Sequence, residues 1–134
     1  MQNRIFIDTG AFVAKYLAND SLHARATKVW ASLSGKKCMT SNHVLDETLT
    51  LLGRRAGYMF ASDRAEAIMN SDLLSVYYSS REDEIEALEY FKKFSDQGIS
   101  FTDATSFAIM KRFNIKTVFS FDVHFDRIKT KRLS

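Results

Sequence analysis

The sequence has no proline, only five glycines and a single cysteine, Cys38. No stretch has the composition of a flexible linker, and no low-complexity run or internal repeat is visible. One cysteine cannot form a disulfide within the chain, which fits a reducing compartment. We therefore expect one domain over residues 1–134, ending in a basic tail that frays.

Long apolar runs are also missing. None approaches the roughly 20 residues needed to span a bilayer. Residues 1–8 lack the apolar region of a signal peptide. We expect a soluble cytoplasmic protein without membrane contact.

The charge is nearly balanced, because 19 lysines and arginines face 16 acids, for a net charge of +3. A mildly basic chain tolerates a phosphate-bearing partner without requiring one. The positions of the acids are therefore more informative than the total. Apolar residues make up 46% of the chain, and eleven phenylalanines suggest an aromatic core.

Short apolar runs alternate with segments of helical periodicity. The predicted strands cover residues 4–7, 37–40, 73–78 and 117–121. The predicted helices cover residues 9–18, 21–33, 43–56, 59–70, 81–94 and 102–113. This alternation predicts an α/β fold with a mainly parallel sheet covered by helices on both sides.

Two acids directly follow predicted strands. Asp8 comes after the first strand, and Asp122 after the last. In open α/β sheets, ligand sites gather beyond the carboxyl ends of the strands. Each residue alone is equally typical of a turn, where aspartate is common.

Glu47 and Asp103 lie beside apolar helix faces. At helical spacing Glu47 is aligned with Val44 and Leu51, while Asp103 is aligned with Phe107. A buried carboxylate is costly unless it is paired, protonated or bound to a cation. The alternatives are a glutamate that reaches water or pairs with an arginine, and an aspartate that complements a helix N-terminus.

Asp126 follows Asp122 by four residues, so one helical turn would bring two like charges together. Either residue is alternatively a turn aspartate. Several carboxylates in one pocket stay ionised at low cost only if cations neutralise them. Oxygen ligands favour Mg²⁺ or Mn²⁺ over zinc, and the histidines, His23, His43 and His124, are scattered.

The order of these acids resembles the PIN-domain family, specifically the VapC-type toxin ribonucleases. The family motifs correspond to FIDTGAF around Asp8, VLDETLTLL around Glu47, SFTDATSFAIM around Asp103 and VFSFDVHF around Asp122. Each motif is short and degenerate, but four of them in the right order form a fairly specific signal. The resemblance spans residues 4–126.

The resemblance implies a PIN-like parallel sheet of about four to five strands between helices. It also implies cleavage of single-stranded RNA or exposed RNA loops with Mg²⁺ or Mn²⁺, a homodimer, and a small antitoxin partner. The implied catalytic and metal-site carboxylates are Asp8, Glu47, Asp103 and Asp122, with Asp126 as an auxiliary ligand. Thr9 and Ser120 occupy positions where members often have a hydroxyl.

The chain departs from the family pattern in its first motif. Gly10 stands where members commonly have serine, so a role for that hydroxyl is in doubt. Residues 58–100 carry no recognisable motif, and we expect them to set substrate and partner specificity.

For the reaction we expect hydrolysis to 5′-phosphate and 3′-hydroxyl ends. Whether one or two metal ions take part stays open. An acidic pocket needs a basic rim to attract RNA. The candidates for that rim are Arg54, Arg55, Lys111, Arg112, Lys116, Lys129, Lys131 and Arg132, each of which is otherwise an ordinary solvated cation.

Other interpretations stay open. A metal-free ribonuclease would use His43 or His124 as acid and base, and would leave 2′,3′-cyclic phosphates. A degenerate PIN-like domain would bind RNA or protein without cutting. Haloacid-dehalogenase-like phosphotransfer is disfavoured because position 10 is glycine instead of a second aspartate. A response-regulator receiver lacks convincingly placed acids and lysine.

Overall fold

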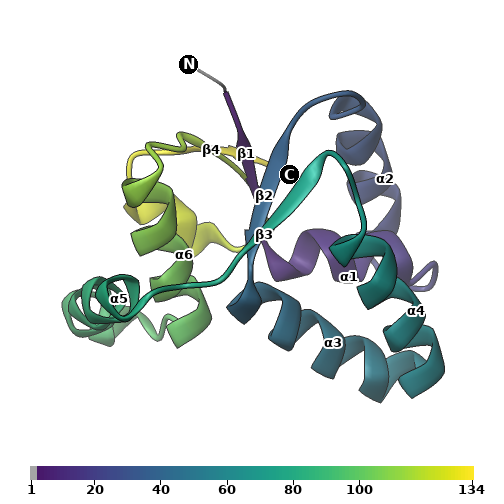
Figure 1. Ribbon diagram of the computed structural model, residues 1–134, viewed down its shortest axis with the longest axis horizontal. Coiled ribbons are helices and arrows are strands. Elements are labelled where there is room, and N and C mark those ends of the chain that lie inside the picture. Colours follow the sequence, from purple (N-terminus) through teal and green to yellow (C-terminus); the bar gives the residue numbers. More distant parts are fainter. Residues whose placement is uncertain (1–2) are drawn as a thin grey trace.

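Five parallel strands form the central sheet of the computed structural model, which describes residues 3–134 (Figure 1). The strands are β1 (Ile5–Ile7), β2 (Cys38–Ser41), β3 (Leu74–Tyr77), β4 (Thr117–Phe119) and β5 (Lys131–Leu133). Their order across the sheet is β3-β2-β1-β4-β5. The first strand is therefore the middle one, and β2 and β4 both pair with it.

Helices cover both sides of this sheet, as the alternating pattern predicted. They are α1 (Thr9–Tyr16), α2 (His23–Ser32), α3 (Asn42–Ala56), α4 (Tyr58–Met69), α5 (Arg81–Lys93) and α6 (Phe101–Arg112). Figure 1 shows α5 and α6 on one side of the sheet, with α1, α2 and α4 on the other. Among residues 3–134, no helix has the length and apolarity needed to cross a membrane.

The core lies around the two central strands. Phe6 and Ile7 of β1 and Val118 and Phe119 of β4 are fully buried. A strand buried on both faces needs apolar side chains at successive positions, which explains the runs IFI and TVF. Burying each such side chain contributes roughly 1.5–3 kcal/mol to the stability of the fold. The ends of β1 and β4 are therefore rigidly placed, and so are the residues that follow them.

Local sequence signals set the boundaries of α3. The Ser41 hydroxyl accepts a hydrogen bond from the backbone N–H of Val44 at 3.2 Å, which caps the first turn. Gly57 ends the helix with a φ of 95°, a conformation that side chains disfavour. The observed helix, Asn42–Ala56, agrees with the predicted range of residues 43–56 to within one residue.

The C-terminal tail differs from the prediction. Residues Lys131–Leu133 do not fray but form β5, which pairs in parallel with β4. A three-residue strand of mostly charged side chains gives no periodic signal. The open edge of β4 orders it through backbone hydrogen bonds. After Asp122 the chain forms η2 (Val123–Arg127), a 3₁₀-helix rather than an α-helical turn.

Candidate metal centre

Four acids from separate parts of the chain line one pocket of about 480 Å³. Asp8 directly follows β1, and Asp122 stands three residues after the end of β4. Glu47 comes from α3, and Asp103 from the first turn of α6. Because β1 and β4 are parallel neighbours, their carboxyl ends deliver two of the acids to the same edge of the sheet.

Ser120 ties two of these acids together. Its hydroxyl donates a 2.7 Å hydrogen bond to Asp8 Oδ2 and accepts a 2.9 Å bond from the backbone N–H of Asp122. The side chain is fully buried, so no water competes for these bonds. One hydroxyl therefore sets the relative positions of the carboxylate after β1 and the backbone after β4.

Asp103 combines a structural and a pocket-lining position. It forms a capping box with Ser100: the Ser100 hydroxyl accepts from the backbone N–H of Asp103 at 3.0 Å, and the Ser100 N–H donates to Asp103 Oδ2 at 3.4 Å. Only 6% of the residue is exposed. The sequence alternative of a helix-terminal aspartate is thus correct, and the same carboxylate also faces the other acids.

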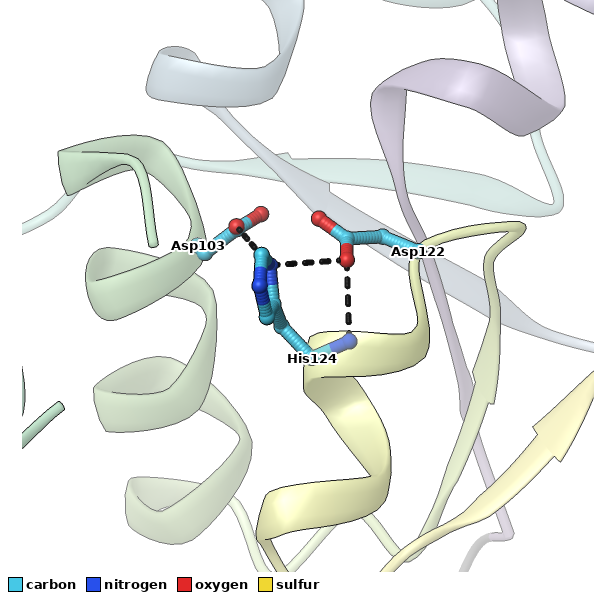
Figure 2. A group of neighbouring side chains, drawn as sticks. All are labelled: Asp103, Asp122 and His124. Atoms are coloured by element: carbon cyan, nitrogen blue, oxygen red, sulfur yellow. Dashed lines mark hydrogen bonds and ion pairs between the residues drawn. The ribbon is translucent and has the colours of Figure 1, made fainter. Parts of the chain in front are cut away.

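His124 approaches this cluster from η2, as Figure 2 shows. Its Nδ1 lies 2.9 Å from Asp122 Oδ1 and 3.6 Å from Asp103 Oδ2. The geometry at Nδ1 does not satisfy a hydrogen bond, so this buried nitrogen has ion-pair contacts with the two carboxylates but no hydrogen-bond partner among the described residues. Asp103, Asp122 and His124 each offer a ligand atom within 4.8 Å of the others.

The electrostatics of the pocket are unfavourable without a cation. Burial raises the pKa of Asp8 to about 6, with smaller contributions from the charges of Asp122 and Glu47. Burial and the charges of Asp8 and Asp122 hold the pKa of Asp103 well above its ordinary value. No lysine or arginine within residues 3–134 lines the pocket. Carboxylate oxygens, an unpartnered imidazole nitrogen and uncompensated negative charge therefore fit a divalent metal ion.

The structure brings together four of the five predicted metal-site acids. Glu47 is half-buried and lines the pocket with Asp8, Asp103 and Asp122. Asp126 is exposed, lies outside the pocket lining, and pairs instead with Arg132 through contacts of 3.0 and 3.3 Å. In a 3₁₀-helix of three residues per turn, positions four apart do not lie above one another, so Asp126 is not aligned with Asp122 along η2.

Other candidate residues are placed as follows. His43 pairs with Glu84 at 2.8 Å and is not among the described residues that line the pocket with Glu47. Thr9 lines the pocket, and its buried hydroxyl has no partner among residues 3–134. Gly10 lines the pocket without a side chain. His124, which the sequence offered only as the acid or base of a metal-free ribonuclease, lines the pocket beside Asp122.

The comparison with protein families decides the relationship. A model of the PIN domain matches residues 5–131. The chain belongs to the PIN-domain family. The PIN-like α/β fold and the VapC-type resemblance predicted from the four motifs are thereby confirmed.

Relatives of this PIN domain are named as nucleases. The chain is 40% identical over 121 residues to the 23S rRNA-specific endonuclease VapC20 of Mycobacterium tuberculosis, covering 90% of this chain and 91% of that protein. It is 34% identical over 123 residues to a VapC ribonuclease of Archaeoglobus fulgidus, covering 89% and 77%.

Solved structures agree with this PIN fold. The crystal structure of Mycobacterium tuberculosis VapC20, described as a sarcin–ricin loop cleaving toxin, has a TM-score of 0.85 at 39% identity and covers 92% of this chain and 93% of that one. VapBC2 from Rickettsia felis, bound to promoter DNA, has a TM-score of 0.71 at 13% identity with 96% coverage of both, and shows the fold alone.

Proposed function

We propose that this PIN domain is a metal-dependent endoribonuclease that hydrolyses RNA phosphodiester bonds to 5′-phosphate and 3′-hydroxyl ends. The observation that carries the proposal is the convergence of Asp8, Glu47, Asp103 and Asp122 on a pocket without a lysine or arginine among its described lining. The relatives named as endonucleases support the same conclusion.

The four acids have distinct roles in this proposal. Asp8, Asp103 and Asp122 hold Mg²⁺ or Mn²⁺, and Glu47 completes the site or orients the attacking water. When bound, the metal supplies charge relief on the phosphate and a water of lowered pKa. Ser120 holds Asp8 through its hydroxyl, and the capping box holds Asp103, so both carboxylates are positioned before RNA arrives.

The substrate proposed for testing is an exposed loop of structured RNA, with the sarcin–ricin loop of 23S rRNA first. Its basis is the similarity to VapC20, whose name and structural description specify this target, over about nine-tenths of both chains. From the family resemblance we also propose a small antitoxin as partner and a homodimer as the assembly of this chain. Copurification with the product of a neighbouring reading frame, and the molar mass in solution, test these two points.

The deciding experiment compares RNA cleavage by the wild type, Asp8→Asn and Asp126→Asn with Mg²⁺ and with EDTA. We expect activity in the wild type and Asp126→Asn with Mg²⁺ only, and none in Asp8→Asn. Mapping should find 5′-phosphates at the new ends. Equal cleavage by wild type and Asp8→Asn would contradict the proposal. Activity in EDTA with 2′,3′-cyclic phosphates would favour histidine catalysis instead.

A further inference from the structure

An aromatic ring forms one wall of the acid pocket. Phe121 lies between Ser120 and Asp122 in the sequence, lines the pocket and is half-buried. Phe119 packs against its ring at 5.8 Å between centroids and an angle of 70°, and Trp30 packs against Phe119 at 5.2 Å. Phe121 is therefore the partly exposed end of a supported aromatic row that begins in the core.

Gly10 leaves space next to this ring. A Cβ at position 10 would lie 3.7 Å from Phe121 Cδ2, which is ordinary van der Waals contact. Any longer side chain, including the serine common in the family, would add atoms beside the ring. The glycine that departs from the family motif thus keeps this part of Phe121 uncovered toward the pocket.

An unpaired cation lies over the same ring. Arg25 of α2 is exposed, and its guanidinium carbon is 5.4 Å from the Phe121 centroid. Within residues 3–134 it forms no ion pair, whereas four of the predicted basic-rim residues do. Those four are Arg55, Lys111, Arg112 and Arg132. At this distance from the centroid the guanidinium is within range of a cation–π contact with the ring.

We propose that Phe121 and Arg25 bind the nucleotide next to the scissile phosphate, the ring stacking on its base and the guanidinium binding its phosphate. This inference rests on the proposed ribonuclease function, because it assigns a substrate contact to the same pocket. Single-stranded RNA is held by this combination of aromatic stacking and a cation along the backbone.

The pairing also suits the charge of the pocket. The four acids repel a phosphate, whereas Arg25 of α2 lies over the Phe121 wall of the pocket but is not part of its lining. An arginine there attracts the backbone without neutralising the carboxylates that would hold metal. Every base has a π-face, so this contact adds affinity with little sequence preference, and it leaves target selection to other surfaces.

The test measures RNA binding rather than cleavage. In an Asp8→Asn background with Mg²⁺, a short fluorescent single-stranded RNA of mixed sequence is titrated, together with an abasic strand of the same sugar–phosphate backbone. Phe121→Leu should weaken binding of the RNA at least about fivefold and leave the abasic strand unchanged. Phe121→Tyr should restore it. Arg25→Ala should weaken both strands and reduce the salt slope of log Kd by roughly 0.7.

Matched controls come from the same chain. Lys28→Ala removes another exposed charge from α2, and it should cost less than Arg25→Ala. The Arg4–Phe113 pair has the same geometry, at 5.1 Å, but lies before β1 and β4 rather than after them. Phe113→Leu should leave RNA binding unchanged.

The outcomes separate the two proposals. A wild type that cuts RNA while Phe121→Leu and Arg25→Ala bind like their controls would overturn this inference alone. Equal losses for RNA and the abasic strand in Phe121→Leu would show a structural role and also overturn it. A wild type that neither binds nor cuts RNA would overturn both.

Discussion

The Ser120 hydroxyl donates a 2.7 Å hydrogen bond to Asp8, which precedes it by 112 positions in the chain. The bond crosses from the end of β4 to the end of β1, two neighbouring strands of the buried sheet. It fixes a carboxylate oxygen from outside its own element, as residues behind a metal site commonly do.

Removing this hydroxyl should damage activity more than stability. Ser120→Ala leaves Asp8 without its donor and the Asp122 N–H without its acceptor, so we expect cleavage to fall about 10–100-fold. The free energy of unfolding should fall by about 1–3 kcal/mol. Ser106→Ala is the control, since that buried hydroxyl bonds within α6 to the Thr102 carbonyl. Similar activity in both variants, measured as initial cleavage rates, would argue against a positioning role.

Neutralising Asp8 should stabilise the metal-free protein at neutral pH. Burial raises the pKa of Asp8 from 3.8 to about 6, so ionising it opposes folding as pH rises through this range. This pKa difference corresponds to a destabilisation of the wild type by at most roughly 3 kcal/mol. The gain in the Asp8→Asn variant is smaller, because asparagine accepts the Ser120 hydrogen bond less well than the carboxylate does. Thermal unfolding in EDTA should show Asp8→Asn more stable than the wild type above pH 6, and no gain below pH 4. If Asp8→Asn had the same melting temperature as the wild type at pH 7, or a lower one, the prediction would be wrong.

A second buried aspartate should behave in the opposite way. Burial alone would raise the pKa of Asp83, but hydrogen bonds from Tyr77 and Ser80 and the charge of Arg112 hold it below its ordinary value. Its carboxylate therefore stabilises the fold above about pH 4, and this stability is lost as pH falls through the folded-state pKa. Asp83→Asn should lose about 1–2 kcal/mol at pH 7 while keeping cleavage. Urea unfolding measures the loss of stability, and a rate assay measures the cleavage. A gain in stability in Asp83→Asn would show that the ionised carboxylate does not stabilise the fold.

Divalent metal should stabilise the wild type through the acid pocket. Adding Mg²⁺ or Mn²⁺ well above its dissociation constant should raise the melting temperature by several degrees, because only the folded chain brings the acids together. Asp103→Asn should abolish most of this rise, while Asp126→Asn should keep it, since Asp126 pairs with Arg132 outside the pocket. Equal metal responses in the two variants would mean that the ion binds elsewhere.

Much of the fold was predictable because its signals are local. Strands buried on both faces give apolar runs such as IFI and TVF, and Ser41 and Gly57 mark the ends of α3 by their own chemistry. β5 was not predictable, because its order comes from pairing with β4 and not from its side chains. The 3₁₀ geometry after Asp122 was also missed, because a five-residue segment is too short for its residue spacing to distinguish a 3₁₀-helix from an α-helical turn.

The candidate site was predictable as a set of acids but not as an arrangement. Strand ends predict that Asp8 and Asp122 meet, since that follows from sheet topology alone. The unpartnered nitrogen of His124 and the open ring of Phe121 depend on distances that no spacing encodes. Asp126 shows that residue spacing can also mislead. Its position four residues after Asp122 suggested a shared metal site, but its carboxylate pairs with Arg132 of β5.

The middle position of β1 has a consequence for synthesis. β1 pairs on one side with β4, which is synthesised more than a hundred residues later, and Asp122 follows that late strand. A nascent or prematurely terminated chain therefore carries three of the four acids without the partner strand that gathers them. The acid pocket, and any activity that depends on it, can therefore assemble only after β4 and Asp122 have been synthesised.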